Sequence, residues 1–228
     1  ETVSVLMQHA DTAMFEAKRA GGNQFRFFSR DLAEAAADRF FLEKGMREAL
    51  AEGQITTHFQ PVCDLGTGAV VGAEALARRW SPQEGWISPG RFIPVAEETG
   101  LIHELGDQVL DQALARFRGW QEAGYRLDRI AVNLSPLQLE STSLPERIRS
   151  LLERHGVAPE RLELEVTEEA ALREEAQVLR RIQELKELGV EIALDDFGTG
   201  FSSPAYLKRF PASRMKIDRS FITNIDAD

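Results

Sequence analysis

The sequence has 228 residues, of which 43% are hydrophobic and 28% charged, a composition typical of one ordinary globular domain with a little to spare. Its net charge of −10 argues against a surface that coats a nucleic acid polymer, although a small phosphate ligand can still bind through divalent cations. The chain shows no signal peptide and no apolar run of about 18 residues that would span a membrane. Its one cysteine, Cys63, excludes an internal disulfide framework. We therefore expect a cytoplasmic location, of a free protein or of the cytoplasmic part of a membrane-anchored one.

The first 52 residues predict two helices with little core of their own. Residues 1–21 predict a helix that ends at Gly21-Gly22. Residues 24–29 alternate polar and aromatic side chains, as a strand does. One helix and one strand are too few to bury a core, so residues 1–29 are interpreted as the end of an upstream domain. Residues 30–38 are interpreted as a linker, within a second helix predicted over 31–52.

From residue 54 onward the pattern changes to strands and helices that follow one another. Residues 55–62 and 69–77 predict the two strands of a hairpin. Later strands alternate with helices, which indicates βα units and a largely parallel sheet. The remaining strands are expected over 129–134, 162–166, 190–195 and 214–217. Helices are expected over 92–98, 101–123, 144–153 and 169–188 and near 205–209.

Polar side chains recur along these predicted strands, mostly where a strand ends. They are Glu74, Asn133, Glu165, the pair Asp195 and Asp196, and Lys216 with Asp218. Parallel strands one βα unit apart present their carboxyl ends at the same rim, where the active sites of barrels lie, so we expect these groups to converge. Converging carboxylates raise one another's pKa unless cations compensate them, and oxygen ligands suit Mg²⁺ or Mn²⁺. The pattern predicts two such ions that clamp a phosphodiester, with a lysine that holds the attacking water or a developing charge.

Seven ordered motifs resemble the EAL domain family. They are FQPV at 59–62, GAEALAR at 72–78, ISPGRFIP at 87–94, VNLS at 132–135, EVTE at 165–168, DDFGTGFSS at 195–203 and KID at 216–218. The resemblance covers residues 39–228, which are interpreted as an EAL domain. It implies an α/β fold, a TIM-like (β/α)8 barrel with an antiparallel first strand. It also implies a metal-dependent phosphodiesterase that hydrolyses cyclic di-GMP to linear pGpG in bacterial second-messenger signalling.

The resemblance also implies roles for individual residues. The metal ligands would be Glu74, Asn133, Glu165, Asp195 and Asp196. Lys216 would bind the nucleophilic water or the phosphate with Asp218 close by, and Glu168 would anchor the loop 196–203, which couples metal binding to dimerisation in this family. A homodimer is therefore expected. Gln60, Leu76, Arg78 and Pro89 would line the dinucleotide, with the planar fork of Arg78 facing a phosphate.

Both ends of the chain depart from a complete EAL domain. Residues 10–23 resemble the final helix and turn of a GGDEF domain, so an upstream GGDEF domain and a sensory domain are expected. The signature loop of that family is absent, and no cyclase activity is assigned. At the other end, a barrel of this kind needs about 250 residues, and the last two βα units have no counterpart in the sequence. Residues 1–228 alone are therefore expected to be inactive, and the predicted activity belongs to the complete domain.

Arg79 occupies the place where the family usually has a tryptophan, and it is expected to put an extra basic residue near the phosphate site. This departure keeps open a catalytically silent receptor for cyclic di-GMP as an alternative to the enzyme. A barrel enzyme of the enolase kind, which also sets acids on successive strands beside a lysine, is a more remote alternative. Trp80, Trp86 and Trp120 are interpreted as packing residues rather than base-stacking platforms.

Overall fold

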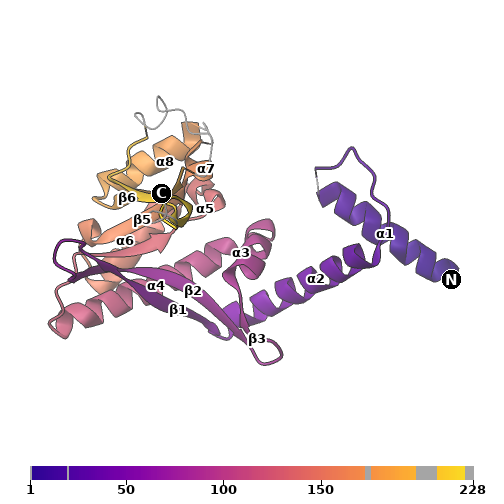
Figure 1. Ribbon diagram of the computed structural model, residues 1–228, viewed down its shortest axis with the longest axis horizontal. Helices are drawn as coiled ribbons and strands as arrows, with labels where there is room; N and C mark the ends of the chain where they lie inside the picture. Colours follow the sequence, from indigo (N-terminus) through magenta and orange to yellow (C-terminus); the bar gives the residue numbers. More distant parts are fainter. Residues whose placement is uncertain (1, 20, 173–175, 199–209, 224–228) are drawn as a thin grey trace.

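The computed structural model describes residues 2–19, 21–172, 176–198 and 210–223. Their centre is a mixed sheet of seven strands in the order β1-β2-β4-β5-β6-β7, with β3 paired to β2 (Figure 1). Strand β1 (Ile55–Cys63) pairs antiparallel with β2 (Val70–Ser81), and β2 pairs antiparallel with β3 (Gly85–Ile87). The other neighbours are all parallel: β4 (Arg129–Asn133), β5 (Leu162–Thr167), β6 (Glu191–Phe197) and β7 (Arg214–Ile217). The α/β class and the antiparallel first strand are as predicted.

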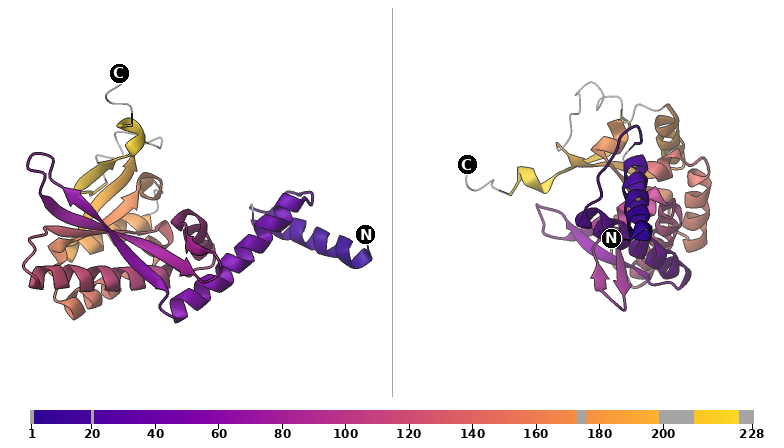
Figure 2. Two further views of the ribbon diagram at one scale, coloured as in Figure 1. Left: turned by 60° about the horizontal axis from the view of Figure 1, so that its bottom comes forward. Right: turned by 90° about the vertical axis from the view of Figure 1, so that its right-hand side faces the viewer.

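Helices cover one face of this sheet. Helices α3 (Pro89–Glu98), α4 (Ile102–Glu122) and α6 (Leu144–His155) follow one another along the chain, and α4 and α6 lie together beneath the strands (Figure 2, left). The other helices beside the strands are α5 (Pro136–Glu140), α7 (Glu168–Leu172) and α8 (Ala176–Glu187). Two 3-10 turns, Pro159–Arg161 and Arg219–Phe221, precede β5 and follow β7.

Strand alternation separates the core from the site. Ile130 and Val132 of β4 and Leu162, Leu164 and Val166 of β5 are buried in the hydrophobic core beneath the sheet. Because successive side chains of a strand point to opposite faces, the residues between them point to the other face. These intervening residues include Asn133 and Glu165. The sheet can therefore hold polar groups above the core without interrupting it.

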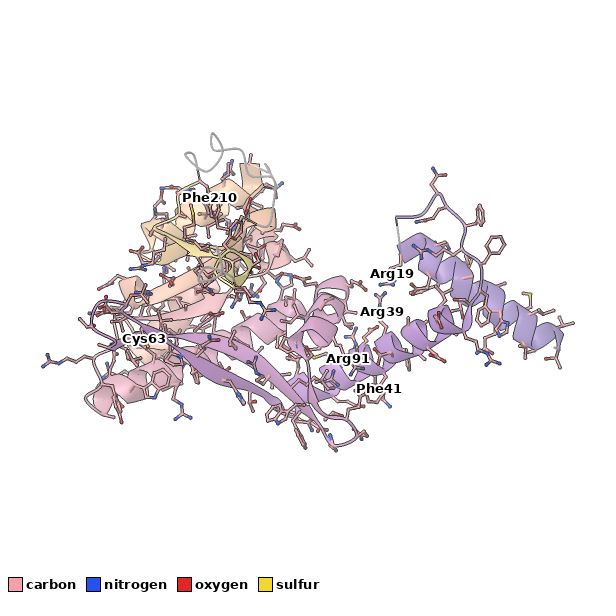
Figure 3. All side chains as sticks on the ribbon, in the orientation of Figure 1. Arg19, Arg39, Phe41, Cys63, Arg91 and Phe210 are labelled. Atoms are coloured by element: carbon pink, nitrogen blue, oxygen red, sulfur yellow. The ribbon has the colours of Figure 1, made fainter. Side chains whose placement is uncertain are left out.

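Helices α1 (Val3–Arg19) and α2 (Arg30–Ala51) form an arm that extends from the sheet (Figure 1). Ion pairs connect this arm to α3: Arg19 pairs with Glu98 at 3.1 Å, Arg39 pairs with the same carboxylate, and Arg91 pairs with Asp38. Figure 3 labels the three arginines along the space between the arm and the body. No helix among the described residues is long and apolar enough to cross a membrane.

Several sequence predictions need correction. Residues 24–29 form no strand, since no described strand pairs with them. Strand β3 and helix α5 were not predicted, and both are short. The helix expected over 169–188 is described as α7 and α8, on either side of residues 173–175. The helix expected near 205–209 lies outside the described residues.

Candidate active site

The strand register brings the predicted polar residues side by side. Gln60 lies opposite Glu74 on the β1–β2 ladder, and Glu74 lies beside Ala131 of β4. Asn133 is then paired with Glu165, while Thr167 is paired with Asp195. These positions lie toward the carboxyl ends of parallel strands, where a barrel fold places its chemistry. The expected convergence is therefore present in the backbone.

The side chains meet around the ammonium group of Lys216 on β7. Its Nζ atom donates a hydrogen bond to Glu165 Oε2 at 2.6 Å and to Glu74 Oε2 at 3.1 Å, and it lies 3.3 Å from Asp195 Oδ2. The Asn133 amide donates to the other oxygen of Glu74 at 2.8 Å. Five residues from five strands thus form one connected group, which we call the lysine-centred cluster: Glu74, Asn133, Glu165, Asp195 and Lys216.

The cluster has more acidic than basic groups. The Glu165 side chain is only 2% exposed, and this burial raises its pKa to about 8, assisted by the charges of Glu74 and Asp195 and opposed by Lys216. Burial by itself would lower the pKa of Lys216, but the hydrogen bond to Glu165 and the surrounding carboxylates outweigh it and raise the pKa. Lys216 therefore stays protonated. Three carboxyl groups share one ammonium, so the site has the electrostatics of a place that takes further positive charge.

Asp196 joins this environment through an unusual backbone conformation. Its φ angle is 53°, in the left-handed region that aspartate tolerates better than most residues. The pairing of β6 with β7 is irregular between Leu194 and Phe197, at this same place. Bulges of this kind redirect side chains next to active sites. Burial raises the pKa of Asp196, and the nearby charges of Asp195 and Asp218 raise it further, so two consecutive carboxylates lie near the cluster.

Glu168 and Asp218 occupy positions beside the cluster rather than within it. The buried Glu168 carboxylate accepts a hydrogen bond from the backbone N–H of Gly198 at 2.7 Å, which ties the start of α7 to the end of β6. The rest of the loop predicted to depend on Glu168 lies outside the described residues. Asp218 caps the 3-10 turn after β7 by accepting from the Ser220 N–H at 2.9 Å, and hydrogen bonding to the side chain and the backbone of Ser220 lowers the pKa of Asp218.

A second polar layer lies one step toward the amino ends of the strands. Glu163 precedes Glu165 by two residues on β5 and is also buried. It forms ion pairs with Arg129 of β4, at 3.4 Å, and with Arg214 of β7. Arg214 precedes Lys216 by two residues on β7, as Glu163 precedes Glu165 on β5, so both layers lie on the same face of the sheet. This layer supports the cluster from below, and the sequence analysis missed it although its spacing of two residues was visible.

Strand β2 carries the residues expected to line the dinucleotide. Its last pair with β4 is Ala75 with Val132, whereas β2 itself runs on to Ser81 as an antiparallel ribbon with β1 and β3. Leu76 and Arg78 follow Glu74 at intervals of two residues and share its face. The described residues include no carboxylate paired with Arg78, whose one hydrogen bond is to the carbonyl of Ala77.

The other two expected contacts differ in their placement. Gln60 is exposed opposite Glu74, and Pro89 is the half-buried first residue of α3. Arg79 does not add a cation to the substrate face, contrary to expectation. It alternates to the opposite face of β2, is 2% exposed and donates to the Leu42 carbonyl of α2. Gly45 leaves room for it, because a Cβ atom at that position would lie 2.0 Å from the Arg79 guanidinium.

The oxygen donors of the site are of the kind that hard divalent cations prefer, although in this structure three of the carboxylates contact Lys216. Four carboxylates and an amide oxygen are the ligands that Mg²⁺ and Mn²⁺ prefer. In the part of the chain that the structure describes, no three acidic, histidine or cysteine side chains stand in an arrangement ready to hold a metal ion. The reason is visible in the contacts, because Lys216 takes up oxygens of Glu74, Glu165 and Asp195.

A mixed sheet that gathers acids, an amide and a lysine at the carboxyl ends of its parallel strands is consistent with a TIM-like barrel. The chain belongs to the EAL domain family, which matches residues 43–228. Phosphodiesterases of this family generally depend on divalent metal ions.

Individual relatives agree with this assignment. The chain is 43% identical over 228 residues to the bifunctional diguanylate cyclase/cyclic di-GMP phosphodiesterase MucR of Pseudomonas aeruginosa, and 41% identical over 227 residues to the cyclic di-GMP phosphodiesterase NbdA of the same organism. These matches cover all of this chain but 33% and 29% of the relatives, so the chain spans about a third of their length. The solved structure of the MucR phosphodiesterase in complex with c-di-GMP superimposes with a TM-score of 0.77 at 45% identity, covering 82% of this chain and 76% of that one.

Proposed function

We propose that this chain contributes the catalytic site of a phosphodiesterase that hydrolyses cyclic di-GMP to linear pGpG with two divalent cations, Mg²⁺ or Mn²⁺. The observation that carries the proposal is the lysine-centred cluster, in which side chains from five strands meet at the edge expected of a barrel active site. The similarity to phosphodiesterases over the whole chain supports the same reaction. Two bound cations would stabilise the negative charge that develops on the phosphodiester as one P–O bond breaks.

The residues of the cluster and their neighbours would have different roles in the reaction. Glu74, Asn133, Glu165, Asp195 and Asp196 would hold the cations. Lys216 would keep its proton and donate hydrogen bonds to the attacking water or to a phosphate oxygen, a role that suits its raised pKa. Glu168 would position Asp196 through the backbone N–H of Gly198, and Asp218 would add negative charge beside Asp196.

The substrate would lie along the ribbon formed by β1 and β2. Gln60 and Leu76 would contact the dinucleotide, and Arg78 would bind a phosphate with its planar guanidinium, which no described carboxylate occupies. Pro89 at the start of α3 would contact the dinucleotide from the α3 side of its binding site. Because Arg79 points away from this face, it gives no reason to prefer a silent receptor over an enzyme.

The test is turnover by the complete protein. Incubation with cyclic di-GMP and Mg²⁺ or Mn²⁺ should produce pGpG, and a chelator should abolish the product until the metal is restored. Glu74→Ala should abolish turnover, whereas Glu122→Ala should not, because Glu122 is an exposed α4 residue paired with Arg118. Tight binding of cyclic di-GMP without product would instead identify a receptor, and full turnover by Glu74→Ala would contradict the metal role of this residue. Homodimerisation, a cytoplasmic location and the GGDEF origin of residues 1–29 stay predictions.

A further inference from the structure

Three aromatic side chains form an exposed group on the ribbon beyond the lysine-centred cluster. Trp86 of β3 contacts His58 of β1 and Trp80 of β2, each with ring centroids 5.3 Å apart and edge-to-face geometry. Trp80 is 48% exposed and Trp86 is 55% exposed. We call these three residues the aromatic shelf. The two indoles pack on each other and on His58 but stay half exposed, so they leave flat ring surface that a ligand can contact.

The aromatic shelf and the candidate substrate residues share one face of the ribbon. His58 lies directly opposite Leu76 in the β1–β2 register, and directly opposed residues point to the same side. Trp80 follows Arg78 by two residues on β2 and therefore has its orientation. The adjacent residue Thr57 points the other way, where its hydroxyl donates to Gln112 of α4 at 3.0 Å. The face therefore runs without interruption from Glu74 past Leu76 and Arg78 to the indoles.

Packing explains the third tryptophan but not these two. Trp120 of α4 is half-buried and packs edge-to-face on Phe59 at 4.9 Å, on the helix side of β1. It therefore has the packing role that was expected of all three tryptophans. Trp80 and Trp86 lie on the opposite face of the ribbon, where they pack on each other and on an exposed histidine and stay half exposed.

We propose that the aromatic shelf binds a guanine base of cyclic di-GMP by stacking. This inference rests on the proposed function, since it takes the phosphates to lie near Lys216 and Arg78. Two residues of strand separate Arg78 from Trp80, about 7 Å, a span that suits a base attached through its sugar to the phosphate at Arg78. Aromatic side chains stack on nucleic acid bases at exposed sites of this kind. An aromatic ring that already packs edge-to-face on a neighbour is fixed in orientation before the base binds.

The experiment measures binding and turnover separately in the complete protein. Trp80→Leu and Trp86→Leu remove the aromatic ring but keep an apolar side chain at an exposed position, so folding should survive. Each is expected to weaken cyclic di-GMP binding roughly 5- to 150-fold, the effect of losing one stacked base. Trp80→Phe and Trp86→Phe should recover most of the affinity, because phenylalanine restores a ring face. Trp120→Phe is the matched control and should leave the affinity unchanged.

A fluorescence measurement separates stacking from a structural role. Cyclic di-GMP should quench the tryptophan emission of the wild type, and the quenching should be lost in the double variant Trp80→Phe with Trp86→Phe even while the ligand still binds. Unchanged affinity in both leucine variants would overturn the aromatic shelf as a base site. So would equal loss with leucine and phenylalanine. A protein that binds cyclic di-GMP through the shelf but makes no pGpG would refute the proposed enzyme and leave this inference standing.

Discussion

Lys216 is the cation that the candidate site depends on when no metal is bound, so its removal should destabilise the fold. Lys216→Met keeps most of the side-chain length and removes the charge. Above the pKa of about 8 that burial gives Glu165, where this carboxylate is ionised, its contact of 2.6 Å with Lys216 corresponds to a gross attraction of about 6 kcal/mol at an effective dielectric constant of 20. The cost of taking both charges out of water offsets much of this, and breaking a fully buried pair typically costs about 3–5 kcal/mol. Because the Lys216 side chain is 33% exposed, we expect a smaller loss of about 2–3 kcal/mol in unfolding free energy.

Chemical denaturation in the presence of a chelator, at a pH above 8 where Glu165 is ionised, measures this loss. The matched comparison is Lys216→Met in a Glu165→Gln background, where the most buried carboxylate is already neutral. There the lysine substitution should cost at least about 1 kcal/mol less, since a double-mutant cycle isolates the pair. A loss below about 0.5 kcal/mol for Lys216→Met, or the same loss in both backgrounds, would refute the idea that the ammonium stabilises Glu165.

Three further substitutions test the surroundings of the site. Phe117→Ala, at a fully buried position of α4, should cost about 3–5 kcal/mol in denaturation, while the exposed Phe40→Ala should change stability by no more than about 0.5 kcal/mol. Arg79→Met should stabilise the protein by about 1 kcal/mol, because burial lowers the pKa of this arginine and its Nε atom has no hydrogen-bond partner; a lower melting temperature would contradict this. Glu168→Ala should speed amide hydrogen exchange at Gly198, whose N–H loses its acceptor, and exchange at the wild-type rate would show that the bond does not protect it.

Most of the elements could be predicted from the sequence because their signals are local. The hydrophobic alternation of β4 and β5 and the amphipathic pattern of α4 are readable in short windows, and β7 has the predicted bounds. The exceptions depend on strand pairing, which the alternation within a short window does not reveal. Residues 24–29 have the alternation of a strand, but no strand among the described residues pairs with them, and β3 is a three-residue strand held by its register with β2.

The candidate site shows the same division. The sequence identified the members of the lysine-centred cluster, because polar residues one βα unit apart must reach the same rim of a parallel sheet. It did not reveal the ion-paired layer of Glu163 beneath them, nor the positive φ of Asp196, which places a second acid beside Asp195. Both features arise from contacts between strands that are distant in sequence.

What the sequence by itself determined is therefore which polar residues recur along the strands and which strand each belongs to, since spacing and alternation are properties of the chain alone. The tertiary structure decided which of these residues touch and which way their neighbours face. Arg79 and Trp80 illustrate the difference: both are adjacent to Arg78 or nearly so, yet the pleat of β2 buries the arginine under α2 and leaves the tryptophan on the substrate face. The physical reason is that a strand assigns faces by parity, but only packing against α2 and α4 fixes which face is covered.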